Sequence, residues 1–228
     1  MKYTTIPHAD IRVSKICLGT MTWGNQNTPA EGFEQMDYAL DAGVNFFDTA
    51  ELYPVPATAD TYADTERIMG DWFASRKNRD KVVLATKIAG PGAYTAHIRT
   101  TGFTPDSIGE ALEGSLKRLQ TDYIDLYQLH WPERNANFFG KRDYFPDHKE
   151  KWQENFQEIL ETLHRFVQQG KIRHIGLSNE TPWASMKYIA LAEQKELPRM
   201  KTIQNPYSLL NRTFEVGNAE VAHREQLG

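Results

Sequence analysis

Short apolar segments rich in β-branched residues recur along the chain at lengths typical of β-strands. They occupy residues 16–20, 44–47, 82–86, 124–129, 172–178 and 200–205. Because their apolar residues run together and do not alternate cleanly with polar ones, we expect strands that are covered on both faces. The opening residues 2–15 predict a short hairpin that turns at Pro7 to Asp10, ahead of the first of these strands.

Segments with helical periodicity lie between the predicted strands. The clearest places its apolar side chains on one face, at Phe156, Ile159, Leu160, Leu163 and Val167, and Gly170 follows it. Thr104–Pro105 and Thr181–Pro182 each combine an N-cap residue with proline at the first helical position, so each predicts the start of a helix. Further helices are expected at residues 68–73 and in the tail 213–228.

The alternation of strands and helices predicts an α/β fold with a parallel sheet, either doubly wound or closed as a (β/α)8 barrel. We count about six such units and find no linker, so residues 1–228 are interpreted as one domain. Two long connections, 89–103 and 132–149, follow strands and are therefore expected on the face that binds ligands. The second contains Phe138, Phe139, Tyr144 and Phe145, which suits either a pocket lid or a surface insertion that folds on itself.

Composition excludes several classes of protein. The chain has 228 residues, of which 40% are hydrophobic and 25% are charged, which is typical of a globular protein. A net charge of -4 gives no positive field for nucleic acid, and no apolar run is long enough for a membrane span or a secretion signal. We therefore expect a cytoplasmic protein without nucleic-acid or membrane partners. Cys17 is the single cysteine and is interpreted as a small core residue.

Ionisable residues follow three consecutive predicted strands. Asp48 ends the second apolar segment with Tyr53 shortly after it, Lys87 follows the third, and His130 follows the fourth. Since the ends of neighbouring parallel strands meet at one mouth of a barrel, we expect these side chains to converge. Each residue taken alone is more often structural, so the joint pattern is what favours a functional site.

These residue types suggest proton donation to an oxygen atom. A buried Lys87 ammonium needs a carboxylate partner, and Asp48 on the adjacent strand is the natural one. A tyrosine beside that ammonium is expected to have a pKa below its usual value of about 10, which would make Tyr53 a better proton donor. His130 can donate a hydrogen bond to a carbonyl oxygen or relay a proton. None of these groups supplies electrons, so a reduction would require a hydride donor.

Several motifs, taken together, resemble the aldo-keto reductase family, whose members are barrels that reduce aldehydes and ketones with NADPH. They are LGTMTWG (18–24), GVNFFDTAELY (43–53), TK (86–87), SLKRLQTDYIDLYQLHWP (115–132), GKIRHIGLSNE (170–180) and TIQNPYSLLNR (202–212). These motifs occur in family order over nearly the whole chain. The phrases LYPVP (52–56) and IQNPYSLLNR (203–212) resemble the bacterial Tas-type branch of the family.

The resemblance implies a catalytic tetrad of Asp48, Tyr53, Lys87 and His130, in which Tyr53 is the general acid. It implies NADPH (NADP+) as the cofactor, held by Gly19, Thr20, Met21, Asp48, Ser178, Asn179 and Gln204. It also implies a small-molecule carbonyl substrate bound by Trp23, Tyr53, His130 and Trp131, and no metal. For each tryptophan, packing in the core is the alternative interpretation.

The chain differs from the family pattern after its sixth unit. Family members close the barrel with two further strand–helix units, which supply the aromatic residue that stacks on the nicotinamide and the residues that grip the phosphates. We therefore expect an incomplete barrel in which the first and sixth strands are exposed edges. We also expect weak cofactor binding or poor folding, and an activity that the missing segment could disable.

Other function classes stay open at this point. A nucleotide-sensing regulatory subunit of the same fold would bind NADPH without turnover. A metal-dependent barrel hydrolase would use Asp and His at strand ends, although the sequence has no HxH-type ligand pair. The oligomeric state and the choice between NADPH and NADH are not determined by the sequence.

Overall fold

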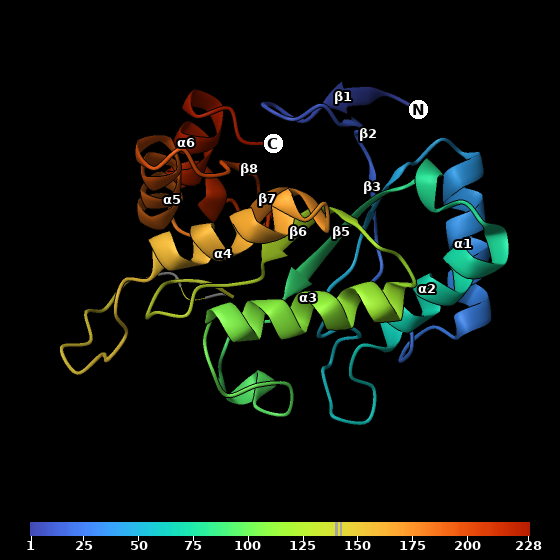
Figure 1. The fold of residues 1–228 in the computed structure, drawn as a ribbon, viewed down its shortest axis with the longest axis horizontal. Coiled ribbons are helices and arrows are strands. Elements are labelled where there is room, and N and C mark those ends of the chain that lie inside the picture. The colour runs from blue at the N-terminus through green and yellow to red at the C-terminus, as the bar shows by residue number, and fades with distance from the viewer. Residues whose placement is uncertain (140, 142) are drawn as a thin grey trace.

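The computed structural model describes residues 1–139, 141 and 143–228. Over these residues, strands and helices alternate, and six strands form an all-parallel sheet in chain order. The strands are β3 (Cys17–Gly19), β4 (Phe46–Asp48), β5 (Val83–Ile88), β6 (Ile124–Leu129), β7 (Ile172–Ser178) and β8 (Met200–Gln204). The sheet curls as part of a barrel, and helices cover its outer side (Figure 1). The predicted α/β barrel-type fold of about six units is confirmed.

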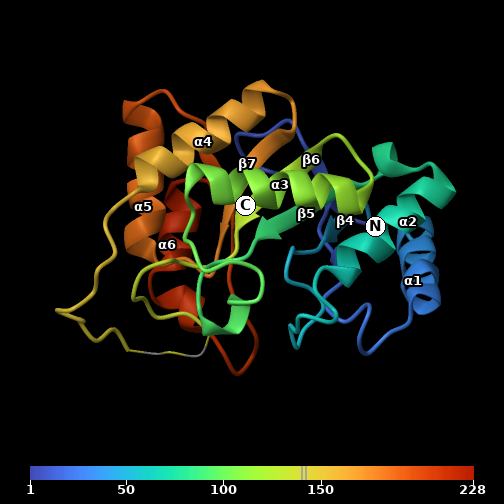
Figure 2. The same ribbon diagram turned by 60° about the horizontal axis from the view of Figure 1, so that its bottom comes forward.

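The helices are α1 (Pro29–Asp41), α2 (Asp64–Arg76), α3 (Pro105–Leu119), α4 (Phe156–Gln168), α5 (Pro182–Gln194) and α6 (Asn218–Arg224). Short 3-10 helices lie at Arg79–Lys81, Ala93–Thr95 and Thr213–Val216. Figures 1 and 2 show α1 and α2 at one end of the molecule and α5 and α6 at the other. The main core cluster lies between these helices and the sheet and includes Trp72, Leu84, Ile108, Leu112 and Leu160.

Local capping explains where several helices begin. Thr104 accepts a hydrogen bond from Ser107 N, as its position before Pro105 predicts. Thr28 and Glu31 form a reciprocal capping box at the start of α1, a helix that the periodicity analysis did not single out although T-P-x-E is a recognised start signal. α5 begins at Pro182 with Thr181 at its N-cap position, as predicted, although among the described residues the Thr181 hydroxyl caps no helical N–H and accepts from Arg134 instead.

The predicted N-terminal hairpin is confirmed as β1 (Tyr3–Thr5) paired antiparallel with β2 (Arg12–Ser14). Its apolar residues Ile6, Ile11 and Val13 pack against Phe46 and Val83, which lie at the starts of β4 and β5. The hairpin therefore covers the amino-terminal end of the sheet. The connections that follow β4, β5 and β6 project from the opposite end (Figure 1).

The two edges of the sheet differ from each other. β3 forms one edge, and Cys17 within it is exposed, so the prediction that Cys17 is a core residue is wrong. An edge strand has a neighbour on one side only, which explains this exposure. The edge at β8 is partly paired: Ile203 N donates to Gly228 O at 3.0 Å, and Gly228 N donates to Lys201 O at 2.8 Å. Within the described residues, no helix has the length and apolar character required to cross a membrane.

Close contact between α2 and α3 makes Gly70 sensitive to substitution. A Cβ at Gly70 would clash with the main-chain oxygen of Arg118, whereas a Cβ at Gly109 would meet Phe166 at 3.5 Å, an ordinary contact. We expect Gly70→Ala to lower the free energy of unfolding by about 1–3 kcal/mol because the helices must separate. Gly109→Ala should instead raise it by up to about 1 kcal/mol, the usual helix preference for alanine. Urea unfolding of both variants checks this, and equal shifts would contradict the close approach.

Candidate active site

The four predicted catalytic side chains converge at the carboxyl end of the sheet. Lys87 Nζ lies 2.7 Å from Asp48 Oδ2 and 3.4 Å from Tyr53 Oη, and it donates to Thr49 O at 2.8 Å. The His130 ring packs edge-on against the Tyr53 ring, with centroids 5.7 Å apart. All four residues are buried. The structure thus brings the predicted tetrad into one cluster.

Strand register accounts for this convergence. In the parallel ladders Asp48 pairs with Ala85, and Lys87 pairs with Gln128. Residues two apart on a strand point to the same face, so Lys87 shares the inner face of the sheet with Ala85 and its partner Asp48. Tyr53 reaches the same place from the connection that follows β4.

Glutamine side chains complete the environment of Asp48. Gln128 Nε2 donates to Asp48 Oδ1 and Gln204 Nε2 donates to Oδ2, each at 3.3 Å. Both carboxylate oxygens therefore accept hydrogen bonds from protein donors. Gln128 was missed by the sequence analysis, although its position two residues before His130 placed it on the same strand face.

Burial and charge act in opposite directions on the Lys87–Tyr53 pair. Burial disfavours the Lys87 ammonium, but Asp48 and Tyr53 outweigh it and hold the pKa of Lys87 above its usual value. Burial also raises the pKa of Tyr53, and the lowering effect of Lys87 does not overcome it. The expectation of a lowered Tyr53 pKa is therefore wrong for this structure. The physical reason is that burial penalises the phenolate, while Asp48 cancels part of the favourable field of Lys87 at the phenol.

His130 is a neutral imidazole in this environment. Burial, together with the nearby Lys87 charge, holds the pKa of His130 well below its usual value. Its Nδ1 atom is buried and has no hydrogen-bond partner among the described residues. The main-chain oxygen of His130 accepts from Asn179 Nδ2 at 2.8 Å, which fixes the end of β6 against the end of β7.

A cavity of about 610 Å³ opens above the tetrad. Its lining includes most of the predicted site residues: Met21, Tyr53, Lys87, His130, Trp131, Ser178, Asn179 and Gln204. It also includes residues that were not assigned to the site beforehand, among them Leu52, Val55, Pro91, Tyr94, Phe138 and Phe139. Of the four aromatic residues proposed as a lid, Phe138 and Phe139 line the cavity, whereas Tyr144 and Phe145 are exposed on the surface.

Four predicted site residues lie outside the cavity lining: Asp48, which is held beneath it by Lys87, and Trp23, Thr20 and Gly19. Trp23 is fully buried in the core, where its Nε1 donates to Gln35 of α1, so the alternative of core packing holds for this residue. Thr20 is also buried, and its hydroxyl donates to the main-chain oxygen of Asp48 at 2.9 Å, which joins the ends of β3 and β4. Gly19 has open space beside it: no described atom lies within 4 Å of where a Cβ would stand.

The ends of β7 and β8 present a group of polar side chains that suits a carboxamide ligand. Ser178 pairs with Gln204 in the ladder, and Asn179 N donates to Gln204 O at 2.9 Å. The side chains of all three residues line the cavity. A primary carboxamide has a carbonyl oxygen that accepts hydrogen bonds and an NH2 group that donates two, so this set of hydroxyl and amide groups fits the nicotinamide carboxamide.

A bound metal ion would require several ligating side chains close together. In the part of the chain that the structure describes, no group of three or more His, Cys, Asp or Glu side chains is arranged to hold a metal ion. At the tetrad, the Asp48 carboxylate is already held by Lys87, Gln128 and Gln204.

Comparisons with known proteins agree with this geometry. The model of the aldo/keto reductase family matches residues 15–228. The chain is 46% identical to Protein tas of Escherichia coli over 99% of its length, and it spans 65% of that protein. It is 40% identical to the uncharacterized oxidoreductase YrpG of Bacillus subtilis, covering 95% of this chain and 61% of YrpG. Norsolorinic acid reductase A of Aspergillus parasiticus is 30% identical, over 97% of this chain and 54% of that protein. The chain belongs to the aldo/keto reductase family.

Proposed function

We propose that this chain carries the acid–base site and the nicotinamide site of an NADPH-dependent reductase of aldehydes or ketones. One observation carries the proposal: Tyr53 lines the cavity, and its hydroxyl lies 3.4 Å from a Lys87 ammonium that is itself paired with Asp48. NADPH, when bound, would supply the hydride that reaches the carbonyl carbon. Side chains of this chain would donate the proton, orient the carbonyl group and hold the carboxamide of the cofactor.

Tyr53 acts as the general acid in this proposal. The proton on Tyr53 Oη passes to the carbonyl oxygen, which becomes the alcohol hydroxyl, and a phenolate remains on Tyr53. The Lys87 ammonium stabilises this phenolate, since opposite charges at such a distance attract strongly in a buried site. Asp48 keeps Lys87 charged and aimed at the phenol.

His130 orients the carbonyl group. As a neutral imidazole it carries one N–H, and it lies beside Tyr53 on the wall of the same cavity. Donation of that N–H to the carbonyl oxygen would place the oxygen next to Tyr53 Oη without adding a second positive charge. The Trp131 ring packs against the His130 ring, and Trp131 Nε1 donates to Pro91 O at 3.2 Å. These contacts fix the orientation of the Trp131 ring as an apolar wall of the cavity.

Ser178, Asn179 and Gln204 would hold the cofactor carboxamide, and Met21 would lie beside it. The remainder of the cavity is mostly apolar, with Leu52, Val55, Trp131, Phe138 and Phe139 in its lining. Such a lining favours aliphatic or aromatic carbonyl compounds because it offers them apolar contact area. Two relatives carry the name norsolorinic acid reductase, which agrees with a reductive role for this chain.

Cofactor binding is tested by unfolding the 228-residue chain with and without excess NADPH. A ligand that binds only the folded state at about 100 times its Kd adds roughly 2.7 kcal/mol to the free energy of unfolding. We expect Gln204→Leu to shrink this gain because it removes a carboxamide partner. The matched control is Gln157→Leu on α4, whose side chain bonds Glu161 and no other side chain in the described part of the protein, and which should leave the gain unchanged.

Turnover is tested separately with a panel of aldehydes and ketones, following oxidation of NADPH. Consumption of NADPH that depends on the carbonyl supports the reductase proposal. Stabilisation by NADPH with no turnover on the panel would favour the nucleotide-sensing alternative. A chain whose unfolding is not shifted by NADPH would contradict both.

A further inference from the structure

A buried glutamate lies in the chain between Asp48, the last residue of β4, and Tyr53 in the connection that follows. Glu51 is 1% exposed, although it carries an ionisable carboxylate and lies between Asp48 and Tyr53 in the chain. Its carboxylate accepts hydrogen bonds from Arg99 Nη1 at 2.7 Å, Arg99 Nη2 at 2.5 Å, Tyr62 Oη at 3.1 Å and Ala89 N at 2.9 Å. Both carboxylate oxygens of Glu51 therefore accept hydrogen bonds, and Glu51 does not line the cavity.

These contacts attach the tyrosine-bearing segment to the strand that carries the lysine. Glu51 N donates to Lys87 O at 3.0 Å, and its carboxylate accepts from Ala89 N two residues further along. The Glu51 side chain thus continues the β4–β5 ladder past the point where the strands end. Lys87 itself provides the first of these two anchor points, so the position of Tyr53 relative to Lys87 depends on them.

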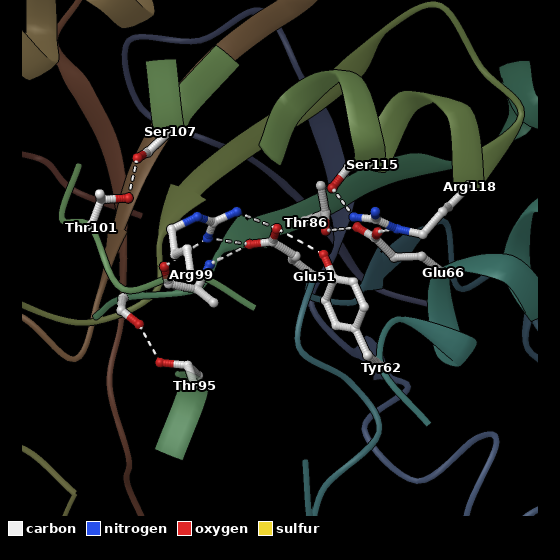
Figure 3. A network of polar contacts seen from close by, with 12 residues as sticks. Glu51, Tyr62, Glu66, Thr86, Thr95, Arg99, Thr101, Ser107, Ser115 and Arg118 are labelled. Carbon is white, nitrogen blue, oxygen red and sulfur yellow. Dashed lines mark hydrogen bonds and ion pairs between the residues drawn. The ribbon is translucent and has the colours of Figure 1, made fainter. Parts of the chain in front are cut away.

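Arg99 connects this anchor to the wall of the cavity. Both terminal nitrogens of its guanidinium donate hydrogen bonds to the Glu51 carboxylate, as Figure 3 shows. Arg99 Nη1 also donates to Ala89 O at 3.2 Å. Arg99 belongs to the connection 89–103, which contributes Pro91, Ala93 and Tyr94 to the cavity lining. The same ion pair therefore joins the substrate-facing loop to the segment that bears the general acid.

Stability alone is a weak explanation for this ion pair. Replacing a buried ion pair by apolar groups of similar volume is often neutral or stabilising, because desolvation opposes the attraction between the charges. A bidentate pair does, however, fix two loops in one relative orientation, since both hydrogen bonds must be satisfied together.

We propose that Glu51, gripped by Arg99, is a positioning residue that sets the distance between Tyr53 Oη and Lys87 Nζ. This inference rests on the proposed reductase function of Tyr53. It extends the site by a residue pair that touches neither the substrate nor the cofactor.

Glu51→Gln tests the proposal. The glutamine amide would direct an N–H at the Arg99 fork, so one of the two hydrogen bonds is lost and the loops shift apart. Because a displacement of about 1 Å at a reacting centre can cost about 100-fold in rate, we expect kcat to fall about 10- to 100-fold. The KM for the carbonyl should change little, since the cavity lining is retained. Arg99→Lys keeps the charge but not the fork, and it should show a smaller loss of kcat in the same direction.

Glu66→Gln is the matched control. Glu66 is also fully buried, and its carboxylate accepts from Arg118 Nε and Thr86 Oγ1, at 2.7 and 2.6 Å, on the side of β5 that faces α2 and α3 (Figure 3). It does not line the cavity. We expect both variants to lower the unfolding midpoint by similar amounts and only Glu51→Gln to lower kcat. Equal kcat values for the two variants would overturn the proposal.

A second measurement does not require turnover. Ring carbon-13 labelling of tyrosine, with the Tyr53 signal assigned from Tyr53→Phe, reports the pH at which Tyr53 begins to ionise. If Glu51→Gln moves Tyr53 away from Lys87, ionisation should begin at higher pH. Simple removal of the Glu51 negative charge would instead move it to lower pH, and that result, or no change, would overturn the positioning role. An inactive wild-type chain would count against the reductase function alone, since this measurement still tests the geometry.

Discussion

Tyr53→Phe is expected to reduce the rate of carbonyl reduction by about 10²- to 10⁴-fold, the usual contribution of a general acid. The phenylalanine ring preserves the packing against His130 but removes the proton that, in the proposed mechanism, passes to the carbonyl oxygen. NADPH affinity should be almost unchanged, because the proposed carboxamide partners Ser178, Asn179 and Gln204 lie at the ends of β7 and β8. Steady-state kinetics combined with a binding titration measures both quantities.

The control for this prediction is Tyr38→Phe, which makes the same chemical change at a 76% exposed position on α1. Its kcat should equal that of the wild-type chain. Retention of full turnover by Tyr53→Phe would remove Tyr53 from the mechanism, and another proton donor near the cavity would have to be sought.

Lys87→Met is expected to lower the free energy of unfolding by about 3–5 kcal/mol, as for other buried ion pairs that lose one partner. The Lys87 and Asp48 side chains are 1% and 8% exposed, so the substitution leaves Asp48 charged and largely cut off from water. Thr49 O also loses its donor. The double variant Lys87→Met with Asp48→Asn should recover much of this loss, because no unpaired charge then remains. Urea unfolding at neutral pH provides the comparison.

The pH of this measurement follows from the direction of the pKa shift. The folded-state pKa of Lys87 lies above its ordinary value, so the stabilisation from this pair is complete below the unfolded-state pKa of about 10.4. It is lost only as the pH rises through the folded-state pKa. Neutral pH is therefore well inside the range in which the pair contributes fully.

Arg76→Met serves as the control, because the Arg76–Asp37 pair has side chains that are 44% and 39% exposed. Exposed pairs contribute about 0–1 kcal/mol, so this variant should be close to the wild type in stability. If Lys87→Met lost no more stability than Arg76→Met, the charged Lys87–Asp48 pair would not be the buried element that the structure describes.

The pattern of residues along the chain predicted the alternation of strands and helices, and the resemblance to a family decided between a doubly wound sheet and a barrel. Each predicted strand formed, because a run of β-branched and apolar residues between helical segments has few other ways to bury its surface. Asp48, Lys87 and His130 could be assigned to one mouth since parallel strands all end at the same side of a sheet. Position relative to a strand end is a local property, and local properties can be read from a sequence.

Tertiary structure alone decided what surrounds each of these side chains. Trp23 lies in the core and Trp131 at the cavity, although both follow apolar segments in the chain. The pKa of Tyr53 depends on a balance between burial, Lys87 and Asp48 that no spacing encodes. The Glu51–Arg99 pair joins residues 48 positions apart, and no sequence pattern around either residue predicts that they pair. Burial and pairing are sums over neighbours from many segments, so they exist only once the strands have assembled.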